Sequence, residues 1–235
     1  MRIDKPIWKT IGILGGMGPE ATSEFYRRII GICQRDYNAK YDSDFPFIFI
    51  YNLPLPDIVE SAGDRESIIK LLEDGISKLK FVGCDFISVP CNTIIYFINS
   101  IDADIPLLNI IKETFFEAKS RNFKRVGILS TANTIRNKLY ESIFDGIEIL
   151  QPSETEQDRV NQIILRILSG LKSQEDKEYL IDLSRMLKKS GAEAVILGCT
   201  DLPLLVSQKD CDVELLDTLQ ILAYSTVKEA RGDYE

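Results

Sequence analysis

The sequence contains no histidine. That absence excludes Ser-His-Asp and Cys-His catalysis, and it excludes any zinc site with histidine ligands. No two cysteines are separated by only two residues, so a zinc site built from cysteines alone is not indicated either. We expect no metal site. Acid–base chemistry must come from cysteine, aspartate, glutamate, lysine or tyrosine.

Long apolar runs and an excess of positive charge are also missing. No stretch approaches the roughly 20 apolar residues of a membrane-spanning helix, and the N-terminal segment lacks the apolar core of a signal peptide. The net charge of −8 disfavours binding to nucleic-acid phosphates or to an anionic membrane, since both require a basic patch. We therefore expect a cytoplasmic protein whose partners are small molecules, not nucleic acid or a membrane.

Cysteine is present, but its five residues form an odd set that fits reduced thiols better than structural disulfides. Cys33 lies on the apolar face of a predicted helix and Cys84 starts a predicted strand, so both are expected in the core. Cys211, between two aspartates, is predicted to lie in an exposed loop. Cys91 and Cys199 differ from these three, because each closes an apolar strand-like run and precedes a threonine by one or two residues.

Strand-like runs alternate with amphipathic stretches along the whole chain. This alternation is typical of βα units and a mainly parallel sheet. The apolar run at residues 45–51 is continuous, as in a strand covered on both faces. The first half of the chain predicts strands at residues 10–14, 45–51, 86–89 and 107–110, and helices at residues 19–33 and 64–80.

The second half of the chain repeats features of the first. The segment Ile11-Gly12-Ile13-Leu14-Gly15 corresponds to Val126-Gly127-Ile128-Leu129-Ser130 at an offset of 115. Cys91 and Cys199 are 108 residues apart, as are Pro106-Leu107-Leu108-Asn109 and Glu214-Leu215-Leu216-Asp217. Strands of α/β proteins resemble one another without common origin, but three ordered matches predict an internal duplication.

The two matched cysteines are the strongest candidates for chemistry. Open α/β sheets bind ligands at the carboxyl ends of their strands, which is where Cys91 and Cys199 are predicted to lie. In two related halves they can face each other and move a proton on opposite sides of one substrate. A helix beginning just after each cysteine is expected to lower the thiol pKa. The alternative is that each is a small core residue.

Three further segments offer polar groups. The loop Gly15-Gly16-Met17-Gly18 precedes Pro19 at a predicted helix start, where backbone N–H groups favour an anion. It is neither a Walker loop nor a dinucleotide-binding fingerprint. Thr131, Asn133 and Thr134 can bind a carboxylate or cap the next helix, and capping is favoured. Asn52 ends a strand as a ligand-facing or a turn residue.

Together these segments resemble the aspartate/glutamate racemase family, over nearly the whole chain. The resemblance implies two similar α/β domains with mainly parallel four-stranded sheets, related by a pseudo-twofold axis, and an active site in the cleft between them. It places residues 1–114 and 218–235 in the first domain and 115–217 in the second, with the C-terminal helix folded back onto the first. It also implies racemisation without pyridoxal phosphate or any other cofactor, and a homodimer.

In this reading Cys91 and Cys199 are the catalytic bases, one for each face of the substrate. The expected function is racemisation of aspartate or glutamate. Alternatives are a broad-specificity racemase of neutral amino acids, a related maleate isomerase or decarboxylase, and a non-catalytic ligand-binding protein on the same scaffold. The residues expected to bind the substrate are Gly16, Met17, Gly18, Asn52, Asn92, Thr93, Thr131, Thr200 and Asp201.

Two departures from the family pattern concern the substrate. Aspartate racemases of this kind carry a basic residue near the position of Ile58, and this sequence has none there. Glutamate racemases proper carry histidine where this chain has Asp201. A side-chain carboxylate then needs another cation, for which Lys172 and Arg166 are the candidates, or else the preferred substrate is not acidic.

Overall fold

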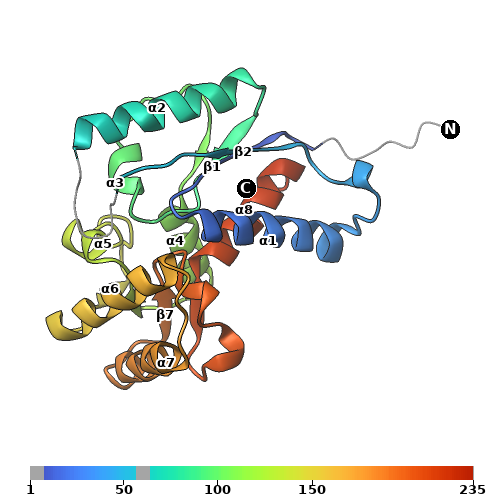
Figure 1. Ribbon diagram of the computed structural model, residues 1–235. Coiled ribbons are helices and arrows are strands. Elements are labelled where there is room, and N and C mark those ends of the chain that lie inside the picture. The colour runs from blue at the N-terminus through green and yellow to red at the C-terminus, as the bar shows by residue number, and fades with distance from the viewer. Residues whose placement is uncertain (1–7, 57–63, 235) are drawn as a thin grey trace.

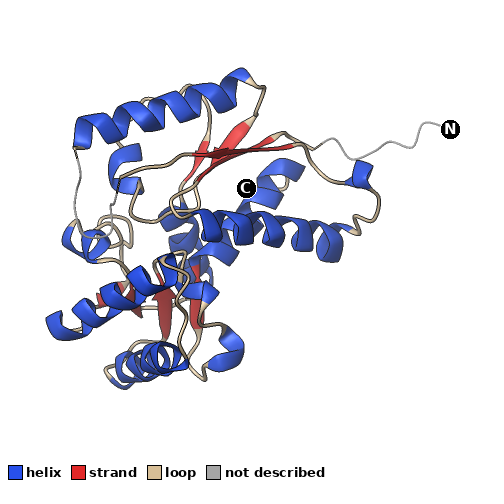
Figure 2. Ribbon diagram, viewed as in Figure 1, coloured by secondary structure: helices blue, strands red, loops and turns tan. Residues whose placement is uncertain are grey.

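The computed structural model describes residues 8–56 and 64–234. The described chain forms two four-stranded parallel sheets, one from each half, with helices packed around them (Figure 1, Figure 2). The strand order is β2-β1-β3-β4 in the first sheet and β6-β5-β7-β8 in the second. The repeated order confirms the predicted α/β class with two similar parallel sheets.

The middle strands of both sheets are buried, which explains their nearly continuous apolar sequences. β1 pairs with β2 and β3, and β5 pairs with β6 and β7. The first sheet consists of β1 (Ile11–Gly15), β2 (Ile48–Asn52), β3 (Phe86–Ser88) and β4 (Leu107–Leu108). The second sheet consists of β5 (Arg125–Leu129), β6 (Glu148–Leu150), β7 (Ala194–Leu197) and β8 (Leu215–Asp217).

β2 corrects one expectation from the sequence. Within the described residues it pairs only with β1, so it is an edge strand. Its neighbouring residues Phe49 and Ile50, whose side chains point to opposite faces, are 40% and 45% exposed. The prediction that the run at 45–51 is covered on both faces is therefore wrong, because a continuous apolar run does not distinguish an edge strand from a central one.

The helices begin and end where the sequence supplies caps. α1 (Pro19–Tyr37) starts with proline and ends before Asn38, whose positive φ of 56° stops the helix. None of the described helices is long and apolar enough to cross a lipid bilayer. The others are α2 (Arg65–Phe81), α3 (Ile95–Ile98), α4 (Ile110–Ser120), α5 (Ala132–Arg136), α6 (Glu154–Leu168), α7 (Gln174–Lys189) and α8 (Thr218–Arg231).

The C-terminal helix α8 folds back onto the first half of the chain, as the resemblance implies. It packs on α1 and α4, and Figure 1 shows the red helix beside the blue one. The Thr226 hydroxyl hydrogen-bonds to the Ser88 hydroxyl at 2.7 Å, and Lys9 N donates to Ala230 O at 2.8 Å. The predicted boundary between residues 114 and 115 falls inside α4, and the division into domains remains a prediction.

The matched segments that end in Asn109 and Asp217 have the same structural role. Each contains a short outer strand, β4 or β8, followed at once by a helix. The Asn109 side chain accepts hydrogen bonds from two backbone N–H groups in the first turn of α4. The Asp217 side chain accepts one from Gln220 N in α8. Equivalent helix caps at matched positions support the inferred duplication.

The three cysteines outside the repeated motif are all buried. Cys33 and Cys84 lie in the apolar core, as predicted. Cys211 is only 7% exposed, so the prediction of an exposed loop residue is wrong. It packs in the same apolar cluster as Val206 and Val213, which flank the two aspartates in the sequence but turn inward.

Candidate active site

Cys91 and Cys199 line one cavity of about 180 Å³. Cys91 follows the end of β3 and Cys199 follows the end of β7. These two strands are inner strands at equivalent places in the two sheets, β3 between β1 and β4 and β7 between β5 and β8. Neither thiol is in a disulfide. The duplicated topology therefore delivers two free thiols to the same small space.

Most of the other residues expected at the site also line this cavity. Asn52 does not, because it lies exposed at the end of β2. Ile58 lies outside the described residues. The expected residues on the cavity wall are Gly16, Met17, Gly18, Asn92, Thr93, Thr131, Thr200 and Asp201. Sequence reasoning missed Pro19, Leu55, Pro56 and Leu168, since apolar side chains in loops and at a helix end carry no chemical signal.

Both thiols are difficult to ionise in the free protein. Burial raises the pKa of Cys91 to about 12, and backbone hydrogen bonds from Ile94 and Thr93 oppose this rise. Burial also raises the pKa of Cys199 well above its usual range, and the charge of Asp201 adds to the effect. The expectation that a following helix lowers these pKa values is therefore wrong, because exclusion of water outweighs the backbone donors.

Three threonine hydroxyls connect the two halves of the chain beside the cavity, and two of them, Thr93 and Thr131, belong to residues that line it. Thr93 follows the first cysteine, and Thr131 and Thr134 lie at the start of α5. Their oxygens are 3.0 to 3.2 Å apart and all three side chains are buried. Thr131 also accepts a hydrogen bond from Thr134 N, so it caps the helix as predicted. The group provides rotatable hydroxyl donors suited to a carboxylate.

Asn92 belongs to a buried hydrogen-bond chain that sequence reasoning did not find. Its Oδ1 accepts from the Tyr140 hydroxyl at 2.7 Å, and its Nδ2 donates to the Thr218 hydroxyl at 3.2 Å. Thr218 in turn donates to Leu197 O at 2.9 Å. The chain thus links the residue after Cys91 to the strand that leads to Cys199. No periodicity or motif in the sequence signals contacts this far apart.

The glycine loop before α1 has a structural role in addition to lining the cavity. Gly16 has a φ of +90°, and a Cβ there would lie 2.6 Å from Leu53 N, so only glycine fits without strain. Its own N–H donates to the Thr22 hydroxyl at 2.9 Å. Gly18 precedes the helix without a side-chain cap. Because Gly18 and Pro19 line the cavity, the positive end of the α1 dipole lies at the cavity wall.

Asp201 is a buried carboxylate on the cavity wall, 4% exposed. Its Oδ2 accepts a hydrogen bond from the Cys199 thiol at 3.6 Å. Its Oδ1 has no hydrogen-bond partner among the described residues. Burial raises the pKa of Asp201 to about 6.

Neither cation suggested by the sequence lines the cavity. Arg166 donates to Asp176 at 2.8 Å in a partly buried ion pair between α6 and α7. Lys172 pairs with Glu20 in the first turn of α1. The described wall contains no lysine or arginine. The described part of the chain also has no cluster of three residues able to hold a metal ion.

Comparison with known proteins agrees with this arrangement. The family model for Asp/Glu/Hydantoin racemase matches residues 14–226. The chain belongs to this racemase family. It is 33% identical over 221 residues to the broad specificity amino-acid racemase RacX of Bacillus subtilis, covering 92% of this chain and 96% of that protein. The protein is therefore an isomerase of the racemase type.

Solved structures show the same two-sheet architecture. A crystal structure described as a putative Asp/Glu racemase from Yersinia pestis has a TM-score of 0.81 and 27% identity, covering 94% of this chain and 99% of the other. The aspartate racemase of Picrophilus torridus has a TM-score of 0.80 and 26% identity, covering 95% and 94%.

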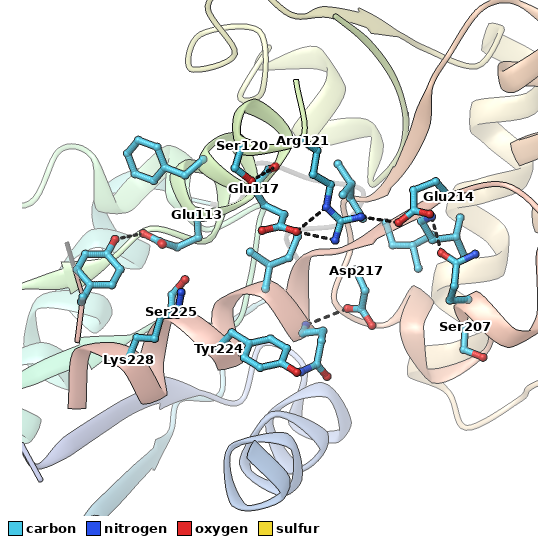
Figure 3. A pocket seen from close by; sticks show the side chains of 18 of the residues that line it. Glu113, Glu117, Ser120, Arg121, Ser207, Glu214, Asp217, Tyr224, Ser225 and Lys228 are labelled. Atoms are coloured by element: carbon cyan, nitrogen blue, oxygen red, sulfur yellow. Dashed lines mark hydrogen bonds and ion pairs between the residues drawn. The ribbon is translucent and has the colours of Figure 1, made fainter. Parts of the chain in front are cut away.

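A second, larger hollow of about 890 Å³ lies on another face of this racemase (Figure 3). It is formed by α4, β8, α8 and the loop before β8, and the described residues that line it include no cysteine. In Figure 3 the Arg121 side chain lies between two carboxylates, Glu117 and Glu214, and forms ion pairs with both. Glu113 accepts a hydrogen bond from Tyr234 at 2.6 Å. The described wall of this hollow lacks the cysteine pair that the smaller cavity holds.

Proposed function

We propose that the protein is a cofactor-independent amino-acid racemase in which Cys91 and Cys199 act as two bases. The observation that carries this proposal is that both free thiols line one cavity, each after the equivalent strand of a duplicated fold. One cysteine as thiolate removes the α-proton and becomes a thiol. The other, as thiol, gives its proton to the opposite face of the α-carbon and becomes the thiolate. Their roles exchange for the other enantiomer.

The remaining polar residues stabilise the carbanion-like transition state. Negative charge grows on the substrate carboxylate when the α-proton leaves, so fixed donors near that carboxylate lower the barrier. The hydroxyls of Thr93, Thr131 and Thr200 and the backbone of Met17 and Gly18 are the donors that we assign to it. Thr93 and Thr131 come from opposite halves of the chain, so a bound carboxylate would hold the halves together.

For the side chain of the substrate, we propose broad acceptance of neutral amino acids. A substrate carboxylate buried without a partner is strongly disfavoured, and the described wall offers it no lysine or arginine. Residues 57–63, which follow Pro56 in the sequence, contain no basic residue. The named activity of the 33% identical relative, broad-specificity racemisation, agrees with this choice. Aspartate and glutamate remain the other outcome of the test.

The test is hydrogen–deuterium exchange at the α-carbon of each of the twenty amino acids in heavy water, followed by kcat/KM for those that exchange. We expect exchange and loss of optical activity for neutral amino acids, preferred over aspartate and glutamate by more than about tenfold. The reverse preference would restore the acidic assignment. No exchange with any amino acid, for protein with both thiols reduced, would contradict the racemase proposal. It would favour an isomerase or decarboxylase of other acids, or a ligand-binding protein.

We further propose that the protein works in the cytoplasm and as a homodimer. The five unpaired cysteines suit a reducing compartment. Sedimentation of the purified protein tests the assembly, where a monomer at all concentrations would contradict it.

A further inference from the structure

Asp201 lines the cavity with a carboxylate that has one oxygen without a hydrogen bond among the described residues. A buried carboxylate oxygen without a hydrogen bond is costly, and folded proteins rarely keep one without a ligand or a function. Oδ1 of Asp201 is such an atom among the described residues. It would lie 3.5 Å from a Cβ added to Gly18, so it faces the glycine loop across the cavity wall.

The surroundings of Asp201 leave a place for one positive charge. Apart from the two thiols, Asp201 is the only titratable side chain on the described wall. Two more distant charges act on it, Glu20 and Lys172, and these two pair with each other. The cavity therefore holds a carboxylate whose positive partner is absent from the described part of the wall.

The position of Asp201 indicates which positively charged group of an amino acid its carboxylate would contact. Its Oδ2 is 3.6 Å from the Cys199 sulfur, which must reach the hydrogen on the α-carbon. A group this close to that sulfur lies beside the substituents of the α-carbon, not at the far end of a side chain. The positive substituent that every amino acid carries on the α-carbon is its ammonium group.

Building on the proposed racemase function, we propose that the Asp201 carboxylate binds the α-ammonium group of the substrate and thereby couples substrate binding to ionisation of the cysteine thiols. In the free protein the negative Asp201 opposes a second negative charge on Cys199 or Cys91. The bound ammonium neutralises that repulsion, so one thiol loses its proton to water and becomes the base. The same contact rejects acids that lack an amino group.

The coupling has a defined pH dependence. Asp201 must be ionised to attract the ammonium, and burial raises its pKa to about 6. The groups that act on Asp201 are Cys199, Glu20 and Lys172, and Asp201 itself acts on both thiols. KM for an amino acid should therefore rise as the pH falls through about 6, and an Asp201→Asn variant should lack this rise.

The experiment compares wild-type protein with Asp201→Asn and Asp201→Ser, and uses Asp210→Asn as the control. Asp210 is a carboxylate nine residues further along that pairs with Lys177 away from the cavity. The first measurement, made without substrate, is the rate of alkylation of Cys91 and Cys199 by iodoacetamide from pH 5 to pH 9, read for each cysteine by mass spectrometry. The second is KM and kcat for the neutral amino acid with the highest kcat/KM.

Above pH 6 the cysteines of both Asp201 variants should be alkylated faster than those of wild type, because removal of the negative neighbour lowers the thiol pKa. Each variant should reach a given alkylation rate at a pH about one unit lower than wild type. KM should rise by about tenfold or more with a smaller change in kcat, and the control should match wild type in both measurements. Unchanged alkylation profiles, or an unchanged KM in an active racemase, would overturn the coupling while leaving the two-cysteine proposal intact. If wild type exchanges no amino acid, the racemase proposal fails. The alkylation profiles alone then decide whether the Asp201 charge opposes ionisation of the two thiols.

Discussion

Asp201 has a cost in stability that its proposed role in substrate binding would require. Burial raises its pKa from 3.8 to about 6, so keeping it ionised in the folded protein costs roughly 3 kcal/mol at neutral pH. Buried ionisable groups with shifted pKa values are concentrated at functional sites, where their charge is needed.

Asp201→Asn should therefore make the free protein more stable, and the gain should depend on pH. Because the folded-state pKa is above the unfolded-state value, wild-type stability falls as the pH rises from about 4 to about 6 and stays lower above that. The Asn variant lacks this loss. Urea denaturation without substrate should show little difference between the two proteins near pH 4 and a clear advantage for the variant at pH 8.

Asp210→Asn is the matched control for that measurement. Its ion pair with Lys177 and its hydrogen bonds to Ser207 hold the pKa of Asp210 at about 2. This substitution should therefore destabilise the protein by the same amount at pH 5 and pH 8. An Asp201→Asn variant that is less stable than wild type at pH 8 would show that its carboxylate is satisfied in the free protein.

At the level of single residues, the sequence indicated which side chains lie at the site better than it indicated their burial and hydrogen bonds. Cys91 and Cys199 stood out because each combined a strand end with a following threonine, and both line the cavity. Their raised pKa values were not foreseeable, since burial depends on which distant segments cover them. Asn92 lines the cavity, and its substrate-binding role stays a prediction, but its hydrogen bonds with Tyr140 and Thr218 were not foreseeable from the sequence.

Among the secondary-structure elements, α8 is connected to the site through hydrogen bonds, although none of its described residues lines the cavity. Its first residue, Thr218, links Asn92 to Leu197 O, while Thr226 two turns later bonds to Ser88 and to Leu222 O. Both hydroxyls are fully buried. Only the first lies in the chain of hydrogen bonds that connects the two cysteine segments.

Thr218→Val and Thr226→Val should therefore differ in activity although both remove a buried hydroxyl. Each should lower the free energy of unfolding by about 1–3 kcal/mol, because partner groups lose a hydrogen bond. Thr218→Val should also lower kcat/KM by about tenfold, since small displacements of catalytic groups slow reactions strongly, whereas Thr226→Val should stay within about twofold of wild type. Equal activity losses in the two variants would assign Thr218 to stability alone.

The elements themselves were predicted well where their periodicity was strong. The helices near residues 19–33 and 64–80 are present as α1 and α2, and the first becomes longer because Asn38 is its stop signal. The burial of β2 was predicted wrongly, since its apolar residues do not show that it lies at the edge of the sheet. The short outer strands were recognisable mainly through the repeated segments that end in helix caps.

Over the whole molecule, duplication is the feature that produces the site. Two sheets of the same order each place one cysteine after an equivalent strand. Neither half carries both of the proposed bases, so the proposed mechanism requires the two halves together. The repeat was visible in the sequence, whereas the contacts that join the halves, such as Thr93 with Thr131, depend on three-dimensional packing.

The most direct test of this account follows α-proton exchange from each enantiomer separately in Cys91→Ser and Cys199→Ser. Serine is too weak an acid to supply a useful anion at neutral pH, so both variants should lose racemisation by orders of magnitude. Each should retain some exchange for one enantiomer only, the one whose α-proton faces the remaining cysteine, and the retained enantiomer should differ between the two variants. Equal exchange of both enantiomers in both variants would contradict the assignment of one cysteine to each face.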